Sequence, residues 1–290
     1  MIYKKGLVSL GINHVGGTIT SFQIGDKHIF YPQQIIKENG ELKLRGGSHI
    51  CFPNFGTNQT SGMNLSRHGF IRDSEFSKFE CYSLPYEDFI KLGFVKFLKN
   101  KAKVECISLE YNYIPNITRN DVTFNYGFRM KSSFYFLDNG FIQNVKISRP
   151  SIIDFPKEPR NPIPINLGFH PYFEFPFSFK KSKIYFGKGL QGKEYISNKE
   201  TFVDIVKPMP TDGNVRLLIA DMAKIHMQFG GLLNNYPDSQ IVLWRPGKSS
   251  PFICVEPVSA DNKFFGTPKG LYLKPEEDSV NAWMMITVDE

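Results

Sequence analysis

Apolar and polar residues alternate along much of the chain with a period of two residues. Between positions 124 and 131, Phe, Tyr, Phe and Met at the even positions alternate with Asn, Gly, Arg and Lys. This period is typical of a strand with one buried face, because successive side chains of a strand point to opposite sides of the sheet. We therefore predict a strand over 124–131, and short apolar or alternating segments predict others at 107–111, 242–244 and 252–255.

The clearest turn lies between two apolar segments. Residues 134–137 are Phe-Tyr-Phe-Leu, the next three are Asp138-Asn139-Gly140, and apolar residues alternate again over 141–147. Asn-Gly accepts the positive φ angles that both central positions of a tight hairpin require. These residues predict a β-hairpin.

The segment Val215–Phe229 is ambiguous. Its apolar residues fit one face of a helix, whereas the alternation of Ile225, Met227 and Phe229 fits a strand that follows a turn. We prefer a hairpin because the neighbouring segments are β, and because 24 Gly and 19 Pro interrupt the chain throughout. The expected fold is one all-β domain over residues 1–290, a large antiparallel β-sandwich of two sheets packed face to face.

Length and composition exclude several classes of protein. The chain has 290 residues, of which 41% are hydrophobic and 14% aromatic, so it can build a sizeable core and is not intrinsically disordered. No window approaches 18 consecutive apolar residues, which excludes a transmembrane helix, and the apolar segment at 7–13 is too short for a secretory signal. We expect a cytoplasmic protein whose four scattered cysteines remain thiols.

The formal net charge of +7 leaves three kinds of partner to consider. Basic proteins often bind nucleic acids, anionic membranes or anionic small molecules. Here the positive residues are dispersed, and the densest groups, at 96–101 and 180–183, adjoin turns. A solvated surface explains this pattern best, so we expect no nucleic acid and no membrane partner. An anionic small molecule remains the alternative. No segment has the pattern of a dimerisation helix, so we expect a monomer.

Two glycine-containing segments near the N-terminus carry polar groups. In Arg45-Gly46-Gly47, the paired glycines let the backbone approach a ligand closely, and the arginine offers a planar set of donors for hydroxyls or phosphate. Farther along, His68 precedes a glycine and lies four positions before Arg72. Taken singly, each segment has a simpler explanation, namely a glycine turn beside a surface arginine and a structural histidine.

Two further segments carry a histidine and a carboxylate. His170 lies within an aromatic segment, 169–173, where burial disfavours the charged imidazole and a nearby carboxylate restores it. Glu256 follows an apolar strand and precedes Pro257, and a carboxylate there is either paired or functional. Nucleotide-binding loops and nucleophile elbows are absent from the sequence, and His49 and His68 lack the spacing of a metal site, so we expect no metal.

In this order the four segments resemble the aldose 1-epimerases, or galactose mutarotase-like proteins. The order is Arg-Gly-Gly, His-Gly-Phe-x-Arg, Phe-His-Pro-Tyr-Phe and Val-Glu-Pro; with Gly-Gly-Thr-Ile at 16–19 and the closing strand at Trp283, the resemblance covers essentially the whole chain. The third motif is closest to bacterial aldose-epimerase-like subgroups. The resemblance implies a supersandwich with a sugar in an open cleft on one sheet. It also implies interconversion of the α and β anomers of an aldose, with no cofactor.

The resemblance also implies roles for individual residues. His170 matches the general acid and Glu256 the general base. Arg45 and His68 match sugar-contacting positions, and Arg72 matches an arginine of related sugar-phosphate epimerases. An acidic sugar contact is expected before the last motif, and Asp238 is the candidate for it.

Two departures from the family pattern bear on function. Val258 stands where relatives usually carry a tryptophan after Glu-Pro, and Ser197 stands where they often carry an aspartate. Three functions therefore remain open. The first is a mutarotase acting on a free hexose. The second is a sugar-phosphate epimerase with a substrate such as glucose 6-phosphate. The third is a carbohydrate-binding protein without catalysis on the same scaffold.

Overall fold

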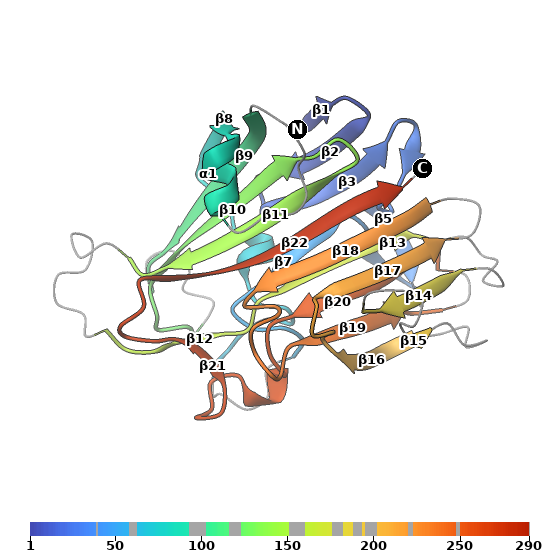
Figure 1. Ribbon diagram of the computed structural model, residues 1–290. Helices are drawn as coiled ribbons and strands as arrows, with labels where there is room; N and C mark the ends of the chain where they lie inside the picture. Colours follow the sequence, from blue (N-terminus) through green and yellow to red (C-terminus); the bar gives the residue numbers. More distant parts are fainter. Residues whose placement is uncertain are drawn as a thin grey trace.

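The computed structural model describes residues 1–38, 40–57, 63–92, 103–115, 123–150, 160–175, 182–187, 193–194, 202–219, 223–247 and 250–289. Two large antiparallel sheets pack face to face in this part of the chain, and two small two-stranded sheets flank them (Figure 1). The predicted all-β sandwich is therefore confirmed.

The first sheet contains both short edge strands and the strands that will carry the candidate site. In spatial order its strands are β1 (Ile2–Lys5), β2 (Val8–Asn13), β3 (Thr18–Ile24), β7 (Ser48–Cys51), β13 (Gly168–Glu174), β20 (Phe252–Val258), β19 (Gln240–Arg245) and β16 (Phe202–Pro208), with β4 (Lys27–His28) paired to β3.

The second sheet is built from longer hairpins. In spatial order its strands are β15 (Lys193–Glu194), β14 (Lys183–Phe186), β17 (Asn214–Ile219), β18 (Ala223–Gly231), β22 (Ser279–Asp289), β11 (Gly140–Ser148), β10 (Phe128–Phe136), β9 (Lys103–Tyr113) and β8 (Lys78–Pro85).

The remaining elements are short. They are the hairpin β5 (Gln34–Glu38) and β6 (Glu41–Arg45), the pair β12 (Ile163–Ile165) and β21 (Leu271–Leu273), helix α1 (Tyr86–Lys91), and the 3₁₀ turns η1 (Ile71–Asp73) and η2 (Asn262–Phe264).

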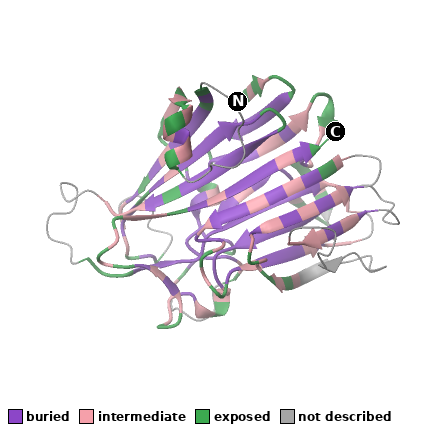
Figure 2. Cartoon of the chain, in the orientation of Figure 1, coloured by how far each residue is buried: buried purple, intermediate pink, exposed green. Residues whose placement is uncertain are grey.

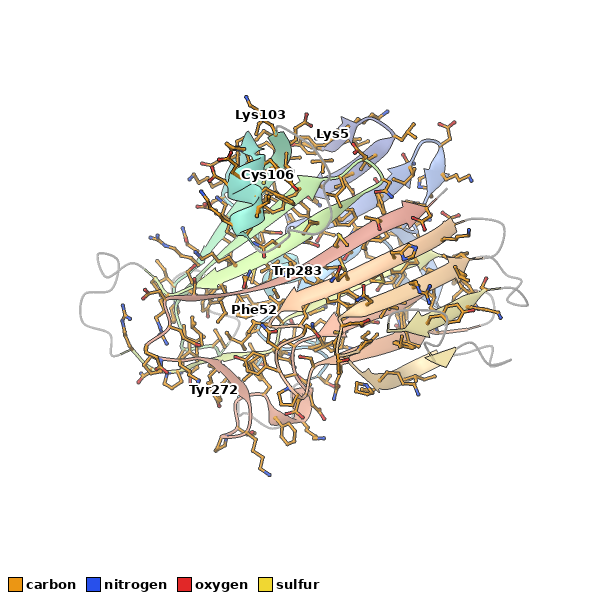
Figure 3. All side chains as sticks on the ribbon, in the orientation of Figure 1. Lys5, Phe52, Lys103, Cys106, Tyr272 and Trp283 are labelled. Carbon is orange, nitrogen blue, oxygen red and sulfur yellow. The ribbon has the colours of Figure 1, made fainter. Side chains whose placement is uncertain are left out.

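Aromatic side chains fill the space between the two large sheets. Phe22 of the first sheet meets Phe141 of the second edge to face, with ring centroids 5.0 Å apart. Phe52, which follows β7 and is labelled in Figure 3, meets Phe128 of β10 at 4.9 Å. Such pairs add about 0.5–1.5 kcal/mol each beyond the apolar area they bury. Figure 2 shows buried residues alternating with half-buried ones along β17 and β18, as expected for strands with one face on the core.

A second, smaller cluster covers the outer side of the second sheet. Phe89 of α1 packs there with Cys106, Tyr135 and Ile142, and half-buried Trp283 lies against the same cluster. Figure 3 places Cys106 beside α1 and Trp283 on β22. Helix α1 thus buries one part of a sheet face that otherwise points outwards.

Both predicted hairpins are present. In the first, β10 pairs with β11 from Phe136 opposite Phe141 onwards, around the predicted turn. The ambiguous segment at 215–229 forms β17 and β18, which pair in register, so the strand interpretation is confirmed over the described residues. The predicted strand at 124–131 is wrong in its first half, because β10 begins only at Phe128.

Two smaller expectations concern cysteines and membrane spans. All four cysteines are thiols; Cys51, Cys106 and Cys254 are buried, whereas Cys81 is exposed. Among the described residues, no helix has the length and apolar character needed to cross a membrane.

Candidate active site

A cavity of about 530 Å³ opens over the central strands of the first sheet, on the face turned away from the core. Side chains alternate along these strands as a two-residue period requires. Phe169 of β13 and Val255 of β20 belong to the core between the sheets. Their neighbours His170 and Glu256 line the cavity instead. Small-molecule sites typically measure about 300–1,000 Å³, so this cavity has a suitable size.

Strand register brings one row of polar side chains together on the cavity floor. His49 of β7 lies directly opposite His170 of β13, and Glu256 of β20 lies opposite Val242 of β19. Pairing of β13 with β20 sets His170 beside Glu256, and His170 Nε2 lies 3.4 Å from Glu256 Oε2. Both side chains are almost fully buried, with exposed fractions of 6% and 3%. The sheet itself therefore assembles an imidazole–carboxylate pair.

Three aromatic rings are stacked along β7 and β13. The His170 ring stacks on His49, with centroids 4.6 Å apart and planes at 24°, and on Tyr172, at 4.8 Å and 17°. The centroids of His49 and Tyr172 are 6.4 Å apart, so these two rings approach the imidazole from neighbouring directions. His68 meets the same imidazole edge-on at 5.2 Å. These contacts restrict rotation of the His170 ring, so its Nε2 stays directed at the carboxylate.

The histidines of this cluster are held in the neutral form. Burial lowers the pKa of His170 well below its ordinary value, and the neighbouring His49 and His68 lower it further. The pKa of His49 is lowered in the same way, first by burial and then by His68 and the arginines. A neutral His170 with its proton on Nε2 can donate to the carboxylate of Glu256.

His68 reaches the cavity from a loop with unusual backbone geometry. Its φ angle is 66°, and Gly69 continues the left-handed turn at 71°. The backbone N–H of Gly56 donates to His68 Nδ1 at 3.2 Å. Burial, followed by Arg67, Arg72 and Arg45, lowers the pKa of His68 to about 3. Nδ1 is an acceptor and the ring is neutral, so Nε2 carries the proton and offers a fixed donor.

Positive side chains surround this floor. Lys43, Arg45, Arg67 and Arg72 all line the cavity. Arg45 also lies over Trp244, with its guanidinium carbon 5.3 Å from the ring centroid. Among the described lining residues the only acids are Glu256 and Asp261, and Lys263 donates to the latter. The cavity therefore carries an excess of positive charge.

Comparison with known proteins places the fold. No protein-family model and no curated protein sequence matches the chain. Solved structures do match along its full length. The Slr1438 protein of Synechocystis has a TM-score of 0.71 and 18% identity, and the alignment covers 100% of this chain and 96% of that one. A galactose mutarotase-like protein of Lactobacillus casei has a TM-score of 0.63 and 14% identity, covering 100% and 99%. The galactose 1-epimerase of Lactobacillus acidophilus has a TM-score of 0.58 and 8% identity, covering 99% and 93%.

The chain has the galactose mutarotase-like fold. The full-length structural matches show this fold. At sequence identities of 8–18% they show the fold alone, so the activity has to be argued from the site itself.

Within this galactose mutarotase-like fold, five of the six predicted site residues meet in one cavity. They are Arg45, His68, Arg72, His170 and Glu256. Asp238 does not join them. It is exposed in the turn between β18 and β19, outside the cavity, and Asp261 is the aspartate that lines it. Val258 lines the cavity, and Ser197 lies outside the described residues.

Several cavity residues were missed by the sequence analysis. His49 lies two residues after Gly47, and Arg67 directly precedes His68, so each lies close to a predicted motif although neither was predicted to line the site. Trp244 was assigned only to a strand, although its alternation with Val242 and Gln240 puts all three on the cavity side. The signal available was the two-residue period, which assigns His49 and Cys51 to one face of β7 and Ile50 to the other.

Proposed function

We propose that the protein is an aldose 1-epimerase, which interconverts the α and β anomers of an aldose by opening and reclosing the ring. The observation that carries this proposal is the His170–Glu256 pair, two proton-transfer groups 3.4 Å apart on the floor of a sugar-sized cavity. Distant structural relatives that are named as epimerases agree with it.

Ring opening requires two proton transfers. The carboxylate of Glu256 takes the proton of the C1 hydroxyl, the bond between C1 and the ring oxygen breaks, and His170 delivers a proton to that oxygen. The product is the open-chain aldehyde. Rotation about the C1–C2 bond presents the other face of C1, and reversal of both transfers closes the ring as the other anomer. His170 is neutral at rest, so it takes up a proton from solvent before it acts as the acid. Burial lowers its pKa and makes this protonated form a strong acid, which gives the proton to the ring oxygen readily.

Unsatisfied polar atoms on the floor support a polyhydroxylated ligand. Within the described part of the chain, His49 Nε2 and His170 Nδ1 are buried without a hydrogen-bond partner. Leaving such a group unpaired costs about 1–3 kcal/mol, which hydroxyls of a bound sugar would offset. Trp244 offers a flat apolar surface beside them for the C–H face of the ring.

The excess positive charge favours a phosphorylated aldose as a second candidate substrate. A phosphate group needs two or more positive donors close together. Arg45 and Arg72 line the same cavity, together with Lys43 and Arg67. Arginine donors bind phosphate oxygens in charge-assisted pairs. A free hexose would not need four cations, whereas the phosphate of a hexose 6-phosphate would contact them while C1 faces His170 and Glu256.

Anomer relaxation measured by polarimetry tests the function and the substrate together. The wild-type chain should accelerate equilibration of α-glucose or of α-glucose 6-phosphate. If phosphate is recognised, Arg72→Gln should lower kcat/KM for the phosphorylated sugar by about 10–100-fold and leave the free sugar less affected. Arg129→Gln, on an exposed position of β10, is the matched control. Equal rates for both sugars would remove the phosphate preference.

A panel of hexoses and pentoses separates the enzyme from a binding protein. Calorimetric binding of a sugar without any acceleration of its anomerisation would contradict the epimerase proposal. That result would favour a carbohydrate-binding protein on the same scaffold.

A further inference from the structure

A third metal-ligating side chain lies beside the imidazole–carboxylate pair. Cys254 is two residues before Glu256 on β20, so both point to the same side of the sheet, and it lies directly opposite Tyr172 of β13. One ligand atom from each of His170, Cys254 and Glu256 lies within 4.8 Å of the other two, and all three residues are buried. The proton transfers of ring opening make no use of this thiol.

The geometry points to a zinc site formed by His170, Cys254 and Glu256, at which Zn²⁺ competes with the sugar and switches the epimerase off. This inference rests on the proposed function for its regulatory consequence, but not for the binding of the metal. Nitrogen, sulfur and carboxylate oxygen are the ligands that zinc takes in proteins.

The spacing of the pair fits zinc closely. Zn–N and Zn–O bonds of about 2.0–2.2 Å at a tetrahedral angle separate two ligand atoms by about 3.3–3.5 Å. His170 Nε2 and Glu256 Oε2 are already 3.4 Å apart. A Zn–S bond of about 2.3 Å requires the sulfur to lie about 3.6 Å from each, so Cys254 has to move by about 1 Å at most. Rotation about its Cα–Cβ bond provides this movement.

Three protein ligands leave one position of the tetrahedron open. His170 and Glu256 line the cavity, so the fourth ligand would be water or a sugar hydroxyl. Zinc sites that keep an open position have this composition of three protein ligands. A metal bound here occupies both proton-transfer groups at once, so neither can serve the ring oxygen or the C1 hydroxyl.

Charge and proton balance are consistent with binding. The thiol of Cys254 loses its proton to solvent as the Zn–S bond forms, and with the carboxylate of Glu256 two negative ligands neutralise the metal. His170 binds through Nε2 as its other neutral tautomer, with the proton moved to Nδ1, which has no other partner among the described residues. This offsets the arginines at the rim. His68 is not a ligand, because its Nδ1 accepts from Gly56 and its Nε2 carries the proton.

The sequence contains no sign of this site, since the ligands come from two strands distant in the chain. His49 and His68 lack the spacing of a metal site, so the sequence predicted no metal. Only the register of β13 against β20 brings the three side chains together.

Cobalt is the probe that reports the thiolate directly. Co²⁺ added to the full-length, tag-free protein should give a thiolate-to-cobalt charge-transfer band in the near ultraviolet, and Zn²⁺ should abolish it. Cys254→Ser should lack the band and bind Zn²⁺ at least about 10–100-fold more weakly, the cost that loss of even an outer-shell partner causes. Cys51→Ser is the matched control, because Cys51 is equally buried in the same sheet, on β7, which β13 separates from β20.

Inhibition is measured for each protein relative to its own zinc-free rate. Zn²⁺ should slow anomer equilibration by the wild type and by Cys51→Ser, with relief by a chelator or by excess sugar, and Cys254→Ser should resist it. A wild type without the band, or a band that survives in Cys254→Ser, overturns the metal site even if epimerisation is normal. If the wild type shows the band but epimerises no sugar, the metal site stands and the proposed epimerase function is wrong.

Discussion

The proposed chemistry depends on His170 and Glu256. Both side chains are buried, so contacts with neighbouring residues fix their positions. Ring contacts with His49, Tyr172 and His68 restrict the plane of the His170 imidazole. A carboxylate with 3% of its side chain exposed has little freedom to turn away from a partner at 3.4 Å. The pair is therefore organised before any substrate binds, which is what efficient proton transfer requires.

Removal of either proton-transfer group should abolish most of the activity. We expect Glu256→Gln and His170→Asn each to lower kcat by about 10²–10⁴-fold, the usual contribution of a positioned acid or base. Thermal unfolding should show that both variants remain folded, and calorimetry that they retain much of the sugar affinity. Glu174→Gln, on the same strand β13 but outside the cavity, is the control. A folded Glu256→Gln protein with undiminished turnover contradicts the mechanism.

His68 should act on binding and rate together. Asparagine is the suitable replacement, because it tolerates the left-handed backbone of this position while removing the Nε2 donor. His68→Asn should raise KM and lower kcat, each by less than the loss caused at Glu256. Because the pKa of His68 is about 3, the ring stays neutral from pH 5 to 8, and its NMR resonances should not shift over that range. A titration near pH 6.5 would rule out the buried, neutral donor.

At the scale of elements, the bend between β6 and β7 determines where Arg45 and His49 lie. Gly47 has a φ angle of 68°, and a Cβ at this position would collide with the backbone carbonyl oxygen of Ile19 on β3. Gly25 has a similar φ of 57° but nothing within 4 Å of the added atom. An added side chain would meet only backbone strain at Gly25, whereas at Gly47 it would meet both backbone strain and a steric collision.

The comparison of these two glycines makes a measurable prediction. Gly25→Ala should cost about 1–2 kcal/mol of unfolding free energy, the cost of a left-handed residue. Gly47→Ala should cost at least ~2 kcal/mol more, because β3 and β7 must separate to admit the methyl group. Urea unfolding measures both values. Equal destabilisation of the two variants would mean that the close approach at Gly47 is unimportant.

Sequence periodicity predicted elements where burial and strand pairing coincide. Asn139-Gly140 and the alternation around it identified the β10–β11 hairpin because the turn requires those residues. Phe124 and Tyr126 alternate equally well but lie outside any strand. The side chain of Phe124 is buried there, and its backbone carbonyl accepts a hydrogen bond from the Tyr113 hydroxyl. Periodicity reports which side chains are buried, and it does not report which backbone groups pair.

The candidate site was predictable by chemistry and not by geometry. His170 and Glu256 stood out as polar groups in apolar segments, yet their separation depends on the pairing of β13 with β20. The two-residue period assigns His49 to one face of β7, but nothing in the sequence says that β7 lies beside β13. Asp238 was chosen by its order in the chain, which does not determine whether a turn faces the cavity.

For the whole molecule, the three neutral histidines couple stability to pH. Burial lowers the pKa values of His49, His68 and His170 in the folded state, whereas the unfolded chain has ordinary values near 6.5. The unfolded state therefore binds more protons below about pH 6.5, and stability must fall as the pH falls through this range. Each histidine contributes up to about 1.4 kcal/mol per pH unit.

Urea unfolding between pH 7 and pH 5 tests this coupling. The free energy of unfolding of the wild type should decrease towards pH 5, and His49→Gln should show a smaller decrease because one proton-binding site of the unfolded chain is gone. Ile50→Val, at the neighbouring core position of β7, removes no titratable group and should follow the wild type in this slope. Identical slopes for all three proteins would show that His49 is not held neutral by the fold.

The position of the reactive pair in mid-strand also limits how such a protein can change over evolutionary time. Side chains on β13 and β20 alternate between core and cavity, so a one-residue insertion in either strand would turn His170 or Glu256 into the aromatic core and bring Phe169 or Val255 out. The loops at 56–57, 67–68 and 261–262, which form the rim, are free of this constraint. Descendants of this chain can therefore acquire new substrates by exchanging or lengthening rim loops, while the length of the strands beneath must be inherited unchanged.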